Sequence, residues 1–159
     1  MKRLKPLPHG ILDYGLAVVF LIAPLAFGFE SEAARSLSRA IGVLYIVASF
    51  VTRYPLGGLK LIPFPVHGVL ETIAALSWIA MPFLFGFADD AAARNFFIIA
   101  AVALLGVVTI TDYRGAERFG ATERRTGETD RRQQRVYVTF ERRVAAVPRR
   151  RGGRLAAQL

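Results

Sequence analysis

Two pairs of side chains in this 159-residue chain combine an imidazole with a carboxylate at a spacing that suits chemistry. His9 precedes Asp13 by four positions, and His67 precedes Glu71 by the same interval. Residues four apart lie on one face of a helix, so each pair would present its two groups together. Imidazoles and carboxylates bind divalent metal ions and relay protons. These four residues are therefore the first candidates for a functional site.

The two pairs belong to an internal repeat. The segments that begin at His9 and His67 match at an offset of 58 residues, and one inserted residue then moves the offset to 59. The matches include a Phe-Gly-Phe triplet in each segment. Later matches pair Arg35 with Arg94, Val43 with Val102, Thr52 with Thr111 and Tyr54 with Tyr113. So many matches with a single gap predict a duplicated unit, residues 9–54 and 67–113.

Each unit contains two apolar segments long enough to cross a membrane. The four segments cover residues 10–29, 36–52, 66–87 and 94–112. A helix of about 20 residues spans the hydrocarbon core, whereas the strands of a membrane barrel are about half as long. We therefore expect an all-α membrane protein with four transmembrane helices in two hairpins. A signal peptide over residues 1–29 is the alternative for the first segment, but the same pattern recurs in mid-chain.

The polar segments complete the domain organisation. Residues 1–8 form a basic arm, residues 55–66 form a linker with three prolines, and residues 114–159 form an arginine-rich tail. Lys and Arg gather in these three segments, whereas the turn inside each unit is acidic. Both termini are therefore predicted to be cytoplasmic. Each unit then enters and leaves the membrane on one side, which predicts parallel units related by a pseudo-twofold axis along the membrane normal.

Parallel units would bring the two imidazoles and two carboxylates to the same membrane depth. A structural role is the favoured interpretation, because Asp13 and Glu71 lie near helix starts, where a negative charge complements the helix dipole, and can pair with Arg53. Asp112 matches Arg53 and completes the predicted polar cluster. The histidines are then expected in the headgroup zone. A metal or proton site is the alternative, and we predict no bound metal or cofactor.

Two prolines, Pro24 and Pro82, lie inside the first and third apolar segments. Each is predicted to kink its helix, with the following Phe-Gly-Phe triplet at the outer interface, and a transport hinge is the alternative role. Small residues recur every seven positions and should let the first and third helices meet closely. This stripe consists of Gly10, Ala17 and Pro24 and of Gly68, Ala75 and Pro82. Trp78 is predicted to pack in the interior.

The tail carries most of the net charge of the chain. From residue 114 onward it contains 13 Arg and 5 Asp or Glu, which is +8 of the total +9. This composition favours a disordered segment. A basic cluster beside a membrane gains about 1 kcal/mol per cation, so anionic headgroups are the expected partner, and no nucleic-acid-binding fold is recognised. The arginines assigned to headgroup contact are Arg124, Arg125, Arg131 and Arg132.

The duplicated hairpin resembles the SPW-repeat family of small bacterial membrane proteins. The resemblance covers residues 9–113 and rests on the proline and Phe-Gly-Phe motifs, on Asn95 and on the linker from Leu61 to His67. Ala-Pro-Leu and Met-Pro-Phe stand where the family has Ser-Pro-Trp. The resemblance implies a four-span protein of the bacterial inner membrane and supplies no activity.

No catalytic signature emerges from the sequence. It contains no Gly-rich phosphate loop and no nucleophile elbow, and its lack of cysteine excludes thiolate chemistry. We therefore expect a non-enzymatic membrane module that contacts the bilayer and, through its tail, anionic lipid, with a homo-oligomer left open. A small transporter or channel with a path between the two units is the alternative.

Overall fold

The computed structural model describes residues 4–113 and residue 131; the rest of the predicted tail lies outside the described residues. The described elements are α1 (Pro6–Ala26), α2 (Glu32–Val51), β1 (Thr52–Arg53), β2 (Ile62–Pro63), α3 (Phe64–Leu84) and α4 (Ala91–Ile110). All four helices are long and apolar enough to cross a membrane. The prediction of an all-α chain with four such helices is confirmed, and it indicates a multi-pass membrane protein.

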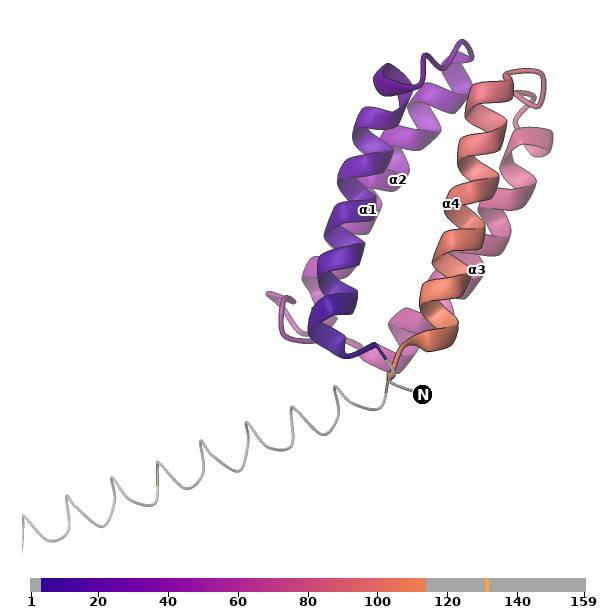
Figure 1. The fold of residues 1–159 in the computed structure, drawn as a ribbon. Helices are drawn as coiled ribbons and strands as arrows, with labels where there is room; N and C mark the ends of the chain where they lie inside the picture. Colours follow the sequence, from indigo (N-terminus) through magenta and orange to yellow (C-terminus); the bar gives the residue numbers. More distant parts are fainter. Residues whose placement is uncertain (1–3, 114–130, 132–159) are drawn as a thin grey trace, which may run out of the picture. The chain divides into compact units, whose positions relative to one another are not determined.

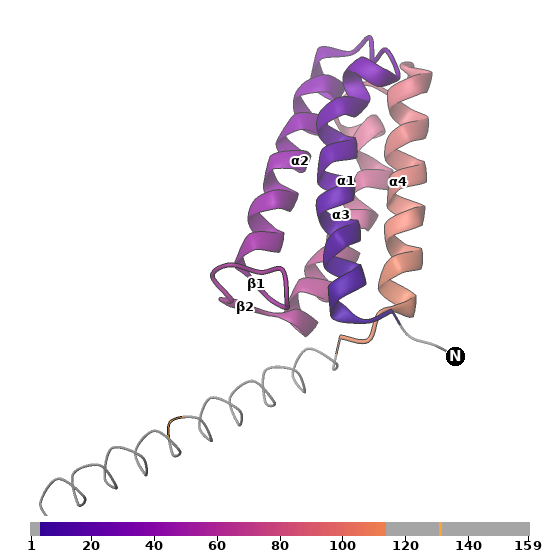
Figure 2. The same ribbon diagram turned by 60° about the vertical axis from the view of Figure 1, so that its left-hand side comes forward.

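The helices stand side by side as two hairpins, α1 with α2 and α3 with α4 (Figure 1 and Figure 2). Both hairpin turns lie at one end, and the start of α1 and the β1–β2 loop lie at the other (Figure 1). At this second end, extended segments supply hydrogen-bond donors to the last carbonyls of α2 and α4. The N–H of Leu61 donates to Val51 and that of Leu4 donates to Ile110, both at 2.7 Å. These short pairings were not predicted, and they satisfy helix ends that would otherwise lack partners.

All four helices begin earlier than the sequence predicts. They start at Pro6, Glu32, Phe64 and Ala91, instead of residues 10, 36, 66 and 94. Prolines occupy the first turn of α1 and α3, where the missing N–H has no helical acceptor to lose. Proline disrupts the interior of a helix, but in these two helices it stabilises the first turn.

The Phe-Gly-Phe triplets terminate α1 and α3. Gly28 has a φ of 63°, in the left-handed region, and the N–H of Phe29 then donates to the carbonyl of Pro24 at 3.0 Å. Pro24 thus lies in the last turn of α1. The equivalent residues at the end of α3 are Pro82, Gly86 and Phe87. The second phenylalanine of each triplet is buried in the core, so it packs inside the protein and does not face lipid, while the depth of the triplets at the outer interface stays a prediction.

Aromatic rings from all four helices fill the middle of the bundle. Phe20 of α1 lies 4.5 Å from Trp78 of α3 and 5.8 Å from Phe97 of α4, measured between ring centroids. Tyr45 of α2 lies 5.5 Å from Trp78. Trp78 is buried, which confirms its predicted packing role.

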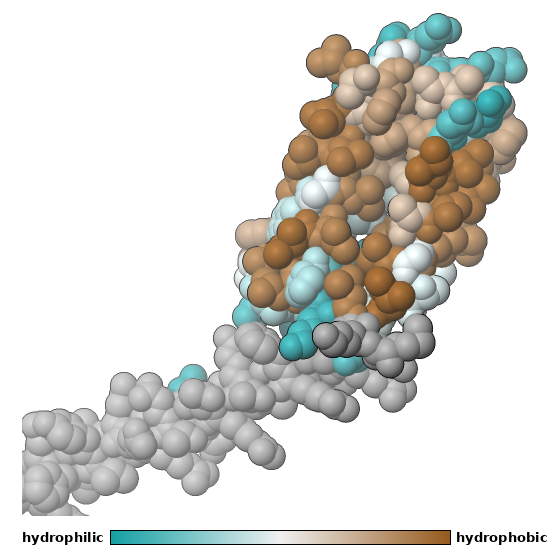
Figure 3. All heavy atoms as spheres, viewed as in Figure 1, coloured by the Kyte–Doolittle hydropathy of each residue, from teal (hydrophilic) through white to brown (hydrophobic). Residues whose placement is uncertain are grey.

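Large apolar side chains also cover the outside of the bundle. Leu25, Leu84 and Ile99 are 90%, 76% and 67% exposed. Brown apolar residues dominate the sides of the helices in Figure 3, and hydrophilic residues gather at the hairpin turns. Soluble proteins rarely expose apolar surface of this extent, whereas a helix facing lipid requires it.

The predicted small-residue stripe does not bring α1 and α3 together. A Cβ on Gly10 would overlap the ring of Tyr54, which belongs to the same hairpin. Deeper in the bundle, the carbonyl oxygen of Ala17 lies against Gly42 of α2. The close approach that small residues permit therefore occurs within a hairpin, whereas the contacts between α1 and α3 include larger side chains such as Phe20 and Trp78.

Asp90 joins the two hairpin turns. Its Oδ1 accepts a hydrogen bond from the N–H of Ala93 and caps α4, and its Oδ2 accepts from the N–H groups of Glu30 and Ser31 at 2.8 and 2.9 Å. Partial burial opposes ionisation, but the three N–H donors outweigh it and lower the pKa of Asp90. The carboxylate of Asp90 therefore caps α4 and also connects the two hairpin turns.

Replacing Asp90 by alanine is expected to lower the free energy of unfolding by about 1–3 kcal/mol, because a cap and two further acceptors are lost. Since the pKa of Asp90 is lowered on folding, its contribution is complete above about pH 4 and is lost as the pH falls through the folded-state value. Unfolding by SDS at neutral and acidic pH measures both effects. Ser31→Ala, which removes only the local cap of α2, is the control. An equal loss in both variants would contradict the link between hairpins.

Candidate functional site

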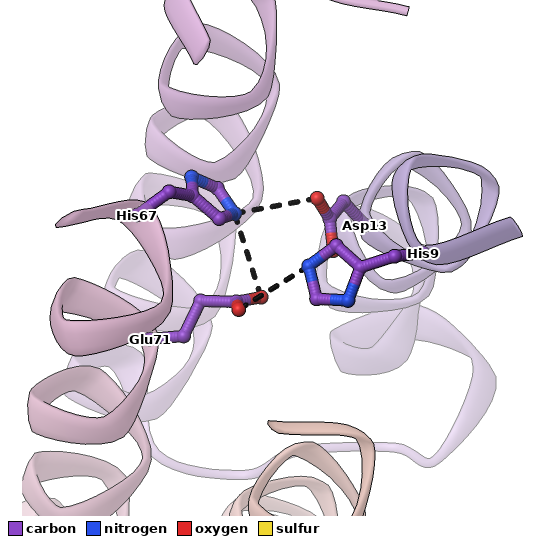
Figure 4. Close-up of side chains that lie close together, drawn as sticks. All are labelled: His9, Asp13, His67 and Glu71. Atoms are coloured by element: carbon purple, nitrogen blue, oxygen red, sulfur yellow. Dashed lines mark ion pairs between the residues drawn. The ribbon is translucent and has the colours of Figure 1, made fainter. Parts of the chain in front are cut away.

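The four side chains that the sequence singled out meet at the end of the bundle opposite the hairpin turns. Figure 4 shows His9 and Asp13 of α1 pointing toward His67 and Glu71 of α3. Nε2 of His9 lies 3.4 Å from Asp13 Oδ1 and 3.3 Å from Glu71 Oε2. Nε2 of His67 lies 3.3 Å from Asp13 Oδ2 and 3.5 Å from Glu71 Oε1. Each carboxylate contacts both imidazoles, so the four residues form a closed His-carboxylate ring.

This ring lies inside the protein. His9 is 0% exposed, Asp13 is 1% exposed, and His67 and Glu71 are each 2% exposed. The ring of Phe64 covers both histidines, with its centroid 5.1 Å from His9 and 6.1 Å from His67. Seven residues of helix, or about 10 Å, separate Asp13 from the start of α1. The histidines are therefore enclosed by aromatic side chains, and their position in the headgroup zone, which concerns membrane depth, stays a prediction.

Two threonines orient the imidazoles from the opposite hairpin. Nδ1 of His9 lies 3.0 Å from Oγ1 of Thr111, and Nδ1 of His67 lies 2.9 Å from Oγ1 of Thr52. Each threonine hydroxyl donates its single hydrogen to the carbonyl four residues earlier, at 2.7 Å for Thr111 and 2.6 Å for Thr52. The hydroxyl oxygen can then only accept from the imidazole. Nδ1 therefore carries a hydrogen in both histidines, and Nε2 faces the carboxylates.

The pairing inside the ring is loose. Nε2 of each histidine, Oδ2 of Asp13 and Oε1 of Glu71 are buried without a hydrogen-bond partner among the described residues. Charge-assisted N–H···O bonds are about 2.7–2.9 Å long, and the separations in the ring are longer. A buried polar atom without a partner costs about 1–3 kcal/mol. The arrangement therefore directs four poorly satisfied atoms toward one centre.

Two tyrosines flank the ring in unequal ways. The hydroxyl of Tyr113 donates to Oε2 of Glu71 at 2.9 Å. The hydroxyl of Tyr54, at the matching position, lies near Ser49 and makes no hydrogen bond to Asp13, which is one methylene shorter than Glu71. Burial raises the pKa of both hydroxyls, and the charge of Glu71 adds to the rise at Tyr113. Both tyrosines therefore remain protonated at neutral pH.

Replacing Tyr113 by phenylalanine is expected to lower the free energy of unfolding by about 1.5–3 kcal/mol, because a hydrogen bond to a buried carboxylate is lost. Tyr54→Phe is the matched control, since its hydroxyl makes no hydrogen bond to a ring carboxylate, and it should lower stability less. SDS titration of both variants compares the two values. Equal losses would mean that the Tyr113 hydroxyl does not support Glu71.

The remaining predicted site residues lie elsewhere. Arg53 is exposed, and its Nε donates to the carbonyl of Lys60 at 3.2 Å. The prediction that Arg53 pairs with the buried carboxylates is wrong, because the histidines occupy that place. Asp112 contributes its backbone N–H to Leu4 and is not part of the ring. Of the four tail arginines, Arg131 is exposed. The other three, Arg124, Arg125 and Arg132, lie outside the described residues.

A comparison with known protein families, with curated proteins and with solved structures finds no match to this chain. The interpretation of the site therefore rests on its own geometry.

Proposed function

We propose that this chain is a non-enzymatic membrane module in which the buried ring joins two helical hairpins. The observation that carries this proposal is the ring itself, because its carboxylates and imidazoles come from α1 and α3 and contact one another across the hairpins. A shift of one hairpin against the other would break these contacts and leave buried ionisable groups without any opposite partner, which disfavours other registers. The two crossed His–Thr contacts add to this effect.

The hairpins are proposed to be parallel repeats related by a pseudo-twofold axis along the membrane normal. Contacts that recur at offsets of 58 and 59 residues support this arrangement. The recurring pairs are His9–Thr111 with His67–Thr52, Gly10–Tyr54 with Gly68–Tyr113, and Leu4–Thr111 with Ile62–Thr52. Each member of the first and third pairs joins one hairpin to the other, as a twofold axis between them would require.

Both termini are proposed to face the cytoplasm, with the protein in a bacterial inner membrane. The excess of Lys and Arg at the end that holds the ring supports this orientation. The chain has no cysteine, so single-cysteine variants provide a clean test. Leu59→Cys in the exposed loop and Asp89→Cys in the exposed hairpin turn report on opposite ends. In intact spheroplasts, an impermeant maleimide should label only position 89, and labelling of position 59 alone would reverse the orientation.

The basic tail is proposed to contact anionic headgroups, which the net charge of +8 supports. Trypsin cleaves after arginine, so tail cleavage of the full chain in nanodiscs reports on this contact. Cleavage should be slower in discs that contain phosphatidylglycerol than in phosphatidylcholine discs, and salt should abolish the difference. A control variant with glutamine at the four assigned arginines should show a smaller difference. Equal cleavage in both lipids would exclude the contact.

A small transporter or channel is the second candidate, since ionisable groups within a membrane span commonly mark ion or proton pathways. The ring favours it, but the packed layer of Phe20, Tyr45, Trp78 and Phe97 fills the bundle beyond the ring and supports the non-transporting module. Proton leak into liposomes that contain the protein distinguishes the two. Leak that Glu71→Gln abolishes would establish transport, and no leak would favour the module.

The resemblance to the SPW-repeat family remains part of this proposal. It is supported by the duplicated Phe-Gly-Phe ends, whose glycines adopt the same left-handed conformation at Gly28 and Gly86. Membership would be consistent with a membrane module for which no chemistry is assigned.

A further inference from the structure

We propose that the His-carboxylate ring binds one divalent first-row transition-metal ion, through Nε2 of His9 and His67 and one oxygen each of Asp13 and Glu71. One such atom from each residue lies within 4.8 Å of all the others. The four residues are at most 2% exposed. This inference goes beyond the joining role proposed above and depends neither on membrane orientation nor on the tail.

The spacing of the ligand atoms fits a tetrahedral ion. Zinc lies about 2.0–2.2 Å from nitrogen and oxygen ligands, so the edges of its coordination tetrahedron are about 3.4 Å. Nε2 of His67 lies at such edge distances from Asp13 Oδ2 and Glu71 Oε1, 3.3 and 3.5 Å. Nε2 of His9 lies 3.4 and 3.3 Å from the other oxygen of each carboxylate. With one oxygen from each carboxylate, the four ligand atoms lie within 4.8 Å of one another. Directly hydrogen-bonded imidazolium and carboxylate groups would approach to about 2.8 Å. The ring is therefore wider than a directly hydrogen-bonded cluster, and a small rotation of the two carboxylates would bring one oxygen of each to tetrahedral distance from both imidazoles.

The threonine contacts prepare both histidines as ligands. Because Nδ1–H donates to Thr111 in His9 and to Thr52 in His67, a neutral imidazole presents the lone pair of Nε2 to the centre. Histidine ligands in metal sites are typically held in this way by a second hydrogen bond. The hydrogen bond from Tyr113 does the same for the carboxylate of Glu71. Three of the four ligands thus have an outer partner that fixes their direction.

Charge and ligand type select the class of ion. Two carboxylates and a divalent cation sum to zero, which a buried site requires. The ion would also satisfy the four buried atoms that have no hydrogen-bond partner in the described chain. Two nitrogen and two oxygen ligands suit zinc and its first-row neighbours, whereas calcium and magnesium take six or more oxygen ligands. The site therefore favours an ion of the zinc type over calcium or magnesium.

The composition of the chain makes a direct test practical. Its only two histidines are His9 and His67, and it has no cysteine, so nitrogen ligation by a side-chain imidazole must involve the ring. The full chain is purified in detergent with a histidine-free tag, stripped with a chelator and titrated with Zn²⁺ and Co²⁺. We expect saturation at one ion per chain and the intense visible absorption of tetrahedral Co²⁺. Absence of saturable binding, or the weak spectrum of octahedral Co²⁺, would overturn the proposal.

Variants assign the binding to the ring. His67→Gln should abolish Zn²⁺ binding, and Asp89→Asn, which removes an exposed carboxylate, should leave it unchanged. Thr52→Val should keep the stoichiometry and weaken affinity about 10–100-fold, because His67 loses its outer partner. Unchanged affinity in both His67→Gln and Thr52→Val would overturn the assignment. If His67→Gln does not fold, the wild-type Co²⁺ spectrum and the Thr52→Val affinity decide between the outcomes.

Discussion

Replacing Asp13 by alanine is expected to destabilise the folded chain by about 3–5 kcal/mol in detergent with a chelator present. The carboxylate contacts both imidazoles from the interior of the bundle, so its loss leaves Glu71 to balance two buried histidines. Because all members of the ring are at most 2% exposed, bulk solvent can do little to stabilise the charge that is left behind. Unfolding by SDS can be followed by the fluorescence of Trp78, the only tryptophan of the chain.

A variant without any of the ring charges should recover most of this loss. Removing one partner of a buried ion pair leaves an uncompensated charge, whereas replacing all partners with apolar residues of similar volume is often neutral or stabilising. The variant replaces both histidines with leucine, both carboxylates with valine and the Tyr113 donor with phenylalanine. If it is as unstable as Asp13→Ala, shape and not charge would explain the effect. Asp89→Ala, at an exposed carboxylate, should change stability by less than about 0.5 kcal/mol.

The internal repeat explains which parts of the ring could be predicted. The four ionisable residues fall at matching positions with a helical spacing, so their convergence near one end of two helices was accessible from the sequence. Their burial was not, because it depends on how Phe64 folds over the histidines from the start of α3. Such contacts depend on how the two hairpins pack, and no periodic pattern within one segment of the sequence predicts them.

The sequence does contain a signal for the two threonines that contact the ring histidines. Thr52-Arg53-Tyr54 matches Thr111-Asp112-Tyr113, and within this triplet only the central position changes its charge. The structure uses the threonine of each triplet as a partner of a ring histidine, and the tyrosine packs on a glycine beside the ring. The central residue lies outside the ring. Arg53 is predicted to pair with the carboxylates only because it carries the opposite charge. The matching threonines and tyrosines on either side of it are the better indicator of which side chains surround the ring.

The exact ends of the helices are a second feature that the hydropathy pattern does not predict. Apolar runs locate all four helices but place every start too late. Prolines begin the first turn of α1 and α3, and the side chains of Ser31 and Asp90 cap α2 and α4 ahead of their apolar runs. A composition window resolves neither effect. The sequence likewise predicts interfacial aromatics in the Phe-Gly-Phe triplets after α1 and α3, but it does not reveal that the glycine of each triplet adopts a positive φ and ends the helix.

Replacing Gly42 by alanine is expected to destabilise the protein by about 1–3 kcal/mol, because the added methyl group cannot be accommodated between α1 and α2. Its Cβ would lie 2.9 Å from the carbonyl oxygen of Ala17 and 2.7 Å from Cγ of Leu21. The leucine can rotate, but the carbonyl belongs to the backbone of α1, so the two helices must separate. SDS titration of the variant, with Trp78 fluorescence as the signal, measures the loss.

Two other glycines provide matched controls for this substitution. Gly15 in α1 and Gly106 in α4 have nothing within 4 Å of an added Cβ, so alanine there should be neutral or stabilising by up to about 1 kcal/mol through reduced backbone freedom. A loss at Gly42 together with no loss at the two controls would locate the close helix contact inside the first hairpin. If Gly15→Ala were the more destabilising variant, an outward face of α1 would have to be packed against another molecule. That result would favour a homo-oligomer and assign one of its contact surfaces to α1.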